Sequence, residues 1–219
     1  MDCPKISLIT VWVLVGLLSL TCAPKGKTRV LVPAEFDLGN YRTVAVADFQ
    51  GQEGKWGKRI ASWLEEGLIK VQVEGKPYFE VVPRSQLYEM LENNKLQVSD
   101  LADPGIARQV GRLLGVDAIF TGTVVEARTD QWIYTYWRLG VILTARVKFT
   151  ARVISTKTGG VVVDQAVSQT RKEDVTGAAD LATIESLEQP LTSCAREAVE
   201  KFIRKISPHY EISDRAKPA

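Results

Sequence analysis

The stretch VILTARVKFTARVISTKTGGVVVDQAVSQ, residues 141–169, decides the fold of this chain. β-Branched and other apolar residues recur through Val141–Ser155 and again through Val161–Gln169, as is typical of strands. Between them, the polar, glycine-ended KTGG of residues 157–160 predicts a hairpin turn. The stretch is therefore expected to form two antiparallel strands.

Further toward the N-terminus, strands and helices are expected to alternate. Arg42–Phe49 and Phe79–Val82 are predicted strands, because both are rich in β-branched or aromatic residues. Between them, apolar residues recur at helical spacing and predict a helix from Trp56 to Val71. Its apolar face consists of Trp56, Ile60, Trp63, Leu64, Leu68 and Val71.

Two more helices and a strand complete the approach to the hairpin. One helix is expected to start at Pro83, and another to run from the cap-and-proline pair Asp103-Pro104 to Leu114. Ala118–Ala127 is the next predicted strand. Ser186–Ile206 is expected to close the domain as an amphipathic helix, with an apolar stripe at Leu191, Cys194, Ala198, Phe202 and Ile206. This order predicts an α/β fold with a mixed, largely antiparallel sheet and helices packed against it.

The N-terminus resembles an export signal. Lys5 precedes the apolar run Ile6–Leu20, and small residues lead to Cys22. A cysteine at this junction predicts lipid attachment, although Ser19 and Thr21 stand where a lipobox usually has other residues. Cleavage without lipidation and a retained anchor remain open alternatives.

The chain is thus expected to divide into four parts. Residues 1–21 are a predicted signal peptide and residues 22–40 a lipidated tether with basic Lys25, Lys27 and Arg29. Residues 41–206 are the predicted α/β domain, and residues 207–219 a C-terminal tail.

Composition excludes several classes of function. A formal net charge of +2 is too small for an electrostatic nucleic-acid binder. Once Cys3 leaves with the signal and Cys22 carries lipid, Cys194 has no cysteine to pair with, and its place on a helical stripe predicts a buried thiol.

Catalytic motifs are missing from the sequence. The single histidine, His209, lies beyond the last predicted helix, so no Ser-His, Cys-His or HExxH pattern is present. Gly51, Gly54 and Gly57 lie between a strand and a helix, but their spacing fits neither a Walker loop nor a dinucleotide fingerprint. We therefore expect no enzyme, no metal and no cofactor.

Several segments, taken in order, resemble the CsgG family of outer-membrane lipoproteins. They are Val30–Pro33, Tyr41–Phe49, Tyr78–Leu87, Leu113–Gly122 and Arg152–Gly160. The resemblance implies a non-catalytic α/β domain on the periplasmic side of the outer membrane. It also implies a ring of subunits, each adding two membrane-spanning hairpins, as in the curli pore.

Two segments stand where such hairpins would be. Arg128–Val141 is short but aromatic, and its candidate membrane or partner contacts are Trp132, Tyr134, Tyr136, Trp137 and Leu139. The alternative is a strand whose rings cover the domain core. Lys172–Gln189 is charged and lacks alternation, so it is expected to be a periplasmic loop that leads into the last helix.

These observations predict a lipoprotein of the outer membrane that acts without catalysis in protein export or envelope assembly. Its expected partners are the membrane through the lipid on Cys22, further copies of itself, and an exported or envelope protein. The alternative is a periplasmic lipoprotein that regulates a peptidoglycan synthase.

Overall fold

The computed structural model describes residues 28–51, 54–135, 139–176 and 184–213. The chain forms two compact units. Pro33–His209 is the main unit, and the second comprises, among the described residues, Thr28–Val32 and residues 210–213.

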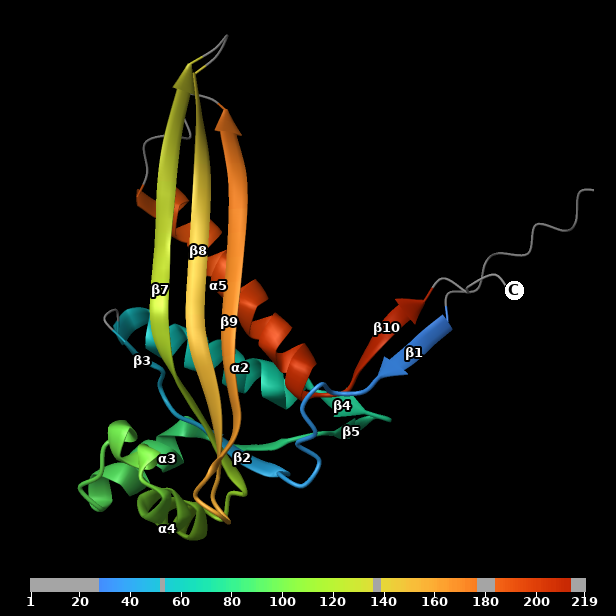
Figure 1. Ribbon diagram of the computed structural model, residues 1–219, viewed down its shortest axis with the longest axis vertical. Helices are drawn as coiled ribbons and strands as arrows, with labels where there is room; N and C mark the ends of the chain where they lie inside the picture. Colours follow the sequence, from blue (N-terminus) through green and yellow to red (C-terminus); the bar gives the residue numbers. More distant parts are fainter. Residues whose placement is uncertain (1–27, 52–53, 136–138, 177–183, 214–219) are drawn as a thin grey trace, which may run out of the picture. The chain divides into compact units, whose positions relative to one another are not determined.

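The main unit is built on a mixed sheet with the strand order β6-β2-β7-β8-β9 (Figure 1). The strands are β2 (Thr43–Val46), β6 (Glu80–Val82), β7 (Ala118–Thr135), β8 (Leu139–Ser155) and β9 (Val161–Thr176). β2 runs parallel to β6 and β7, whereas β7, β8 and β9 pair antiparallel. A short strand, β3 (Gln50–Gly51), lies parallel to β7. The predicted mixed, largely antiparallel α/β fold is confirmed.

Helices cover the two faces of this sheet unequally. α2 (Gly54–Lys70) and α5 (Ile184–Ile206) share the larger core with Val44, Val46 and Phe120. α3 (Arg84–Asn93), the 3-10 turn Val98–Ala102 and α4 (Pro104–Leu114) form a second core with Ala45 and Ile119. Neighbouring residues of one strand point to opposite faces, so the two cores lie on opposite sides of the sheet.

The expected helix and turn signals act as predicted. The Asp103 carboxylate accepts hydrogen bonds from the amides of Gly105 and Ile106, at 2.7 and 3.1 Å. Gly115 ends α4 in the left-handed conformation, at φ 69°. Gly159, at φ 75°, lies in the turn that joins β8 to β9.

Close packing explains one of the three glycines that follow β2. A Cβ on Gly57 would overlap the backbone carbonyl of Phe49, so only glycine lets α2 approach this closely. The stripe predicted for the last helix, from Leu191 to Ile206, is buried against the sheet.

The long strands differ from the prediction. β7 continues eight residues past Ala127 to Thr135, and β9 continues past Gln169 to Thr176. The segment Lys172–Gln189, predicted to be a loop, therefore begins as strand, and its last residues belong to α5. Cross-strand pairing with β8 compensates for the charges that made this segment look like a loop.

Order also extends beyond the predicted domain ends. Leu38 is buried in the main core, and the Phe36 amide donates to the Lys205 carbonyl at 3.0 Å. In the residues predicted as tether and tail, β1 (Thr28–Val32) pairs with β10 (His209–Ser213) as a two-stranded sheet. A second two-stranded sheet joins β4 (Gln72–Val73) and β5 (Lys76–Pro77).

Candidate functional site

A β-bulge at Val125 divides the long strands into two halves. The pairing of β7 with β8 shifts between Val124 and Glu126, which leaves Val125 as the extra residue, 68% exposed. β3 also ends its pairing with β7 at Val124. We call the part from Ala118 to Val124, with its partners on β8 and β9, the proximal half. The distal half comprises Glu126–Thr135, Leu139–Lys148 and Ser168–Thr176.

The bulge changes which residues of β7 face the helices. Before it, even-numbered residues such as Phe120 and Val124 face the larger core; after it, Ala127 takes this place, opposite Val147. On β8, Val141, Leu143, Ala145 and Val147 remain buried. One face of the distal half is therefore apolar along its central strand, and α5 lies along it (Figure 1).

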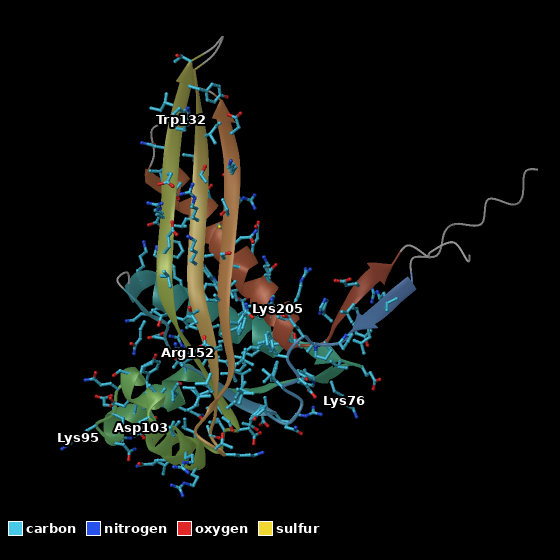
Figure 2. The ribbon with its side chains drawn as sticks, in the orientation of Figure 1. Lys76, Lys95, Asp103, Trp132, Arg152 and Lys205 are labelled. Carbon is cyan, nitrogen blue, oxygen red and sulfur yellow. The ribbon has the colours of Figure 1, made fainter. Side chains whose placement is uncertain are left out.

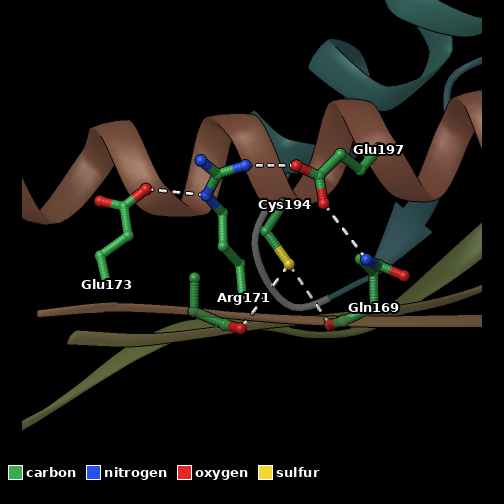
Figure 3. Close-up of polar contacts among 6 residues, drawn as sticks. Gln169, Arg171, Glu173, Cys194 and Glu197 are labelled. Atoms are coloured by element: carbon green, nitrogen blue, oxygen red, sulfur yellow. Dashed lines mark hydrogen bonds and ion pairs between the residues drawn. The ribbon is translucent and has the colours of Figure 1, made fainter. Parts of the chain in front are cut away.

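Polar contacts join α5 to the outer strands at this level, and Figure 3 shows those with β9. The Arg171 guanidinium on β9 bridges Glu173, at 2.8 Å, and Glu197 of α5. Gln169 donates to Glu197 at 3.2 Å, and the Thr129 hydroxyl donates to the Leu187 carbonyl at 3.1 Å. The two carboxylates raise the pKa of Arg171, which stays fully charged.

Cys194 lies in the same interface and is fully buried. Its Sγ is 3.3 Å from the Gln169 carbonyl and 3.6 Å from that of Ala145. Burial raises the pKa of the thiol, which therefore stays protonated and unreactive. The predicted packing role of Cys194 is confirmed.

The opposite face of the distal half carries a ladder of ion pairs. Glu126 contacts Arg128 and Lys148, at 2.9 and 2.8 Å, and Asp130 contacts Arg146 at 3.0 Å. Glu126 and Lys148 are opposite each other on adjacent strands, Arg146 reaches Asp130 diagonally across the strands, and Arg128 lies two residues from Glu126 on β7, so the charges largely cancel. No helix of the described chain contributes to this ladder, which leaves the face open to solvent.

Beyond the ladder, the strands end in exposed apolar side chains. Trp132 is 72% exposed and lies toward the far end of β7 (Figure 2), and the neighbouring Ile133 is 61% exposed. Trp132 pairs with Ile142 and shares the open face, whereas Ile133 pairs with Val141 on the face of α5. The alternative expectation, that the rings of this stretch cover the core, is wrong for Trp132.

Tyr134 crosses the sheet at its end. Its ring occupies the space that a Cβ on Gly140 would fill, and its hydroxyl donates to Asp174 on β9 at 2.8 Å. The hydrogen bond to the carboxylate raises the pKa of the phenol. One side chain thus ties together all three strands of the distal half.

The structure brings together only some of the predicted contact residues. Trp132 and Tyr134 lie at successive positions of the open face, and Leu139 is the first residue of β8. Tyr136, Trp137 and the lipidation candidate Cys22 lie outside the described residues. The predicted contact residues did not include Ile133 and Ile142, and the available signal was the continuous apolar character of Trp132–Tyr134 and Val141–Leu143.

The described residues contain no group of three or more potential metal-ligating side chains. His209, the single histidine, is the first residue of β10, which pairs with β1. None of the described helices is long and apolar enough to cross a membrane.

Residues 34–131 match the family model described as curli production assembly/transport component CsgG. This part of the chain is similar to the CsgG family. The resemblance predicted from the sequence is therefore confirmed, and the match ends within the distal half of β7. No curated protein matches the chain.

Solved structures that are similar to the chain include several lipoproteins. The lipoprotein GNA1162 of Neisseria meningitidis is 16% identical, with 71% of this chain and 96% of that chain covered and a TM-score of 0.42. A PelC dodecamer from Paraburkholderia phytofirmans is 17% identical, with 82% of this chain and 98% of the PelC chain covered and a TM-score of 0.39. LpoB of E. coli is 12% identical, with 61% of this chain and 59% of the LpoB chain covered and a TM-score of 0.40.

Proposed function

We propose that this chain is an envelope lipoprotein that acts without catalysis in protein export or assembly at the outer membrane. The observation that carries the proposal is the CsgG-family match over residues 34–131. The distal half, with its open edges and exposed apolar end, supports a role in contacts rather than in chemistry.

Cys22 is the proposed site of lipid attachment. It ends an apolar run of signal-peptide length, and small residues surround it. One acyl chain holds a protein only marginally at a membrane, whereas the several chains of a bacterial lipoprotein hold it stably. The lipid would place the CsgG-like domain at the periplasmic face of the outer membrane.

Self-association is proposed to use the edges of the distal half. β9 is the last strand of the sheet, and β7 has no described strand partner on its outer side beyond Val124. Open edges of this length present unpaired backbone groups to other chains. The open edges of β7 and β9 are therefore the proposed contact surfaces between copies.

The strand directions constrain how copies can join. β7 and β9 both pair antiparallel with β8, so they run in the same direction. A ring that joins β9 of one copy to β7 of the next would pair parallel strands. A two-fold dimer would instead pair β9 with β9, or β7 with β7, in the antiparallel sense.

Cysteine crosslinking distinguishes these arrangements. Arg128 and Thr170 both face Arg146, so they lie at the same level on the two edges. We expect the double variant Arg128→Cys/Thr170→Cys to form a ladder of disulfide-linked multimers in membranes. The single variants are matched controls, and a dimer from either one alone would indicate a two-fold joint.

Two further measurements test the proposed function as a whole. Protein extracted in detergent should appear as rings in negative stain, and the Cys22→Ala variant should leave the membrane fraction. A uniform population of monomers that crosslinks to a peptidoglycan synthase would contradict self-association and favour the regulator alternative. Retention of Cys22→Ala in membranes after a salt wash would contradict the lipid anchor.

A further inference from the structure

We propose that the end of the β7–β8 hairpin inserts into the interface of one leaflet of a lipid bilayer and does not cross it. This hairpin end, defined as Gln131–Thr135 and Leu139–Leu143, is called the tip. The inference rests on the proposed function in one respect, because the membrane concerned is the one that holds the lipid on Cys22.

The tip is apolar on both faces of the sheet. Trp132 and Ile142 lie on the open face, and Ile133 and Val141 lie on the other, with Trp132 and Ile133 more than half exposed. A protein partner that docks on a sheet covers one face. A hairpin that exposes large apolar groups on both faces is better suited to lipid, because acyl chains can contact both faces at once.

A polar boundary lies immediately behind the tip. The next row of the open face is Asp130, Thr144 and Lys172, and the row behind it contains Arg128 and Arg146. Charged groups at this level would remain in the water and headgroup layer, because burial of unpaired charge in hydrocarbon is costly. These two charged rows therefore limit how deeply the hairpin can enter the bilayer.

The length of the tip agrees with a shallow insertion. A strand that spans the hydrocarbon core needs roughly 9–11 residues. Gln131–Thr135 supplies about half of this number, some 17 Å at about 3.3 Å per residue. Arg138, the sole charged residue between Asp130 and Arg146 in the sequence, also opposes placement of the hairpin end at the bilayer centre.

The aromatic groups have the chemistry of an interfacial belt. Tyr and Trp favour the level of the lipid headgroups, where the ring is buried and the polar group remains hydrated. Tyr134 directs its hydroxyl to Asp174, which lies in the same row as Trp132 and Ile142. This row marks the headgroup level, and Thr135, at the described end of β7, enters the upper acyl region.

Site-directed spin labelling tests the depth directly. Thr135, exposed at the end of β7, is replaced by cysteine and labelled with a nitroxide; Lys172→Cys provides the comparison site behind the tip. The full-length acylated protein is placed in vesicles of phosphatidylethanolamine and phosphatidylglycerol. Buried Cys194 is shielded from the label.

The Thr135→Cys label should collide more often with oxygen than with a water-soluble nickel chelate, and the Lys172→Cys label should show the reverse. Trp132→Ser/Ile133→Ser should return the Thr135→Cys label to water. The matched control Val161→Ser/Val162→Ser, which removes exposed apolar groups at the start of β9, should leave it in lipid. Nickel chelate trapped inside the vesicles should not relax the Thr135→Cys label.

Two results would overturn the inference. A Thr135→Cys label in water on vesicle-bound protein shows that the tip does not insert, and its relaxation by trapped chelate shows that the tip crosses. Both leave the lipid anchor intact. By contrast, wild-type acylated protein that does not stay with vesicles would contradict the proposed function itself.

Discussion

The proximal and distal halves of the same three strands are built in different ways. In the proximal half, helices pack on both faces and the side chains of Phe120, Ile119 and Val153 are completely buried. In the distal half, α5 covers one face of the sheet and no described helix covers the other, and the contacts of α5 with the outer strands are largely polar. Stability is therefore concentrated in the proximal half, which leaves the distal surface free for contacts with other molecules.

The largest effect on stability should come from the proximal core. Phe120 is fully buried and meets Phe79 edge-to-face, with ring centroids 6.3 Å apart. Phe120→Ala should lower the free energy of unfolding by about 3–5 kcal/mol, because it leaves a cavity between sheet and helices. Urea denaturation followed by circular dichroism measures this loss. A loss below 1 kcal/mol would show that the proximal half does not dominate folding.

A smaller effect is expected at the proximal end of the sheet, where Asp117 joins three segments. Its carboxylate accepts from the amides of Arg42 and Thr43, each at 3.1 Å, and pairs with Lys157 at 3.1 Å. Burial by itself would raise the pKa, but the hydrogen bonds from Thr43, Lys157 and Arg42 outweigh it, and the pKa of Asp117 lies below its ordinary value. The ionised form is therefore bound more favourably in the folded state.

Asp117→Asn should cost about 1–2 kcal/mol at neutral pH, a moderate loss since the side chain is 26% exposed. A lowered pKa stabilises the fold above the ordinary carboxyl range and ceases to do so as the pH falls through the folded value. The difference between wild type and variant should thus shrink below about pH 4. Urea midpoints of both proteins, measured from pH 7 to pH 3, give this difference in stability. A difference that grows on acidification would contradict this account.

In the distal half, the loss of a polar contact should act only locally. Arg171→Leu removes the bridge between Glu173 and Glu197 on side chains that are about 40% exposed. The global unfolding midpoint should stay close to that of wild type, because surface ion pairs contribute little. Hydrogen exchange should accelerate in distal β9 and in the adjoining turns of α5. Acceleration that spreads to β2 would show that the two halves are not separate.

The sequence was sufficient to predict the proximal half. Strand runs, the Asp103 cap and the Gly159 turn each depend on local chemistry, and each element appears where it was expected. The distal half was underestimated, because the charges of Arg171, Glu173 and Asp174 resemble a loop until their partners on other elements are known. The bulge at Val125 was hidden for a related reason, since it exists only in the pairing with β8.

The candidate site was predictable in kind but not in extent. The aromatic density around Trp132 and Tyr134 identified the segment. Its exposure depends on where α5 lies, and the interaction of Tyr134 with Asp174 spans 40 residues of sequence. Such long-range contacts follow from strand pairing, which local patterns do not encode.

The most direct test of the division between the two halves is vesicle binding by the tip alone, without the lipid anchor. The Cys22→Ala protein, which should be washed from membranes, should still bind vesicles weakly and reversibly through the tip. In this background, Trp132→Ser/Ile133→Ser should keep the urea midpoint of its parent and weaken equilibrium vesicle binding at least about tenfold, as expected when large apolar groups no longer leave water. Unchanged vesicle binding, or a fall in the urea midpoint as large as that of Phe120→Ala, would contradict the account.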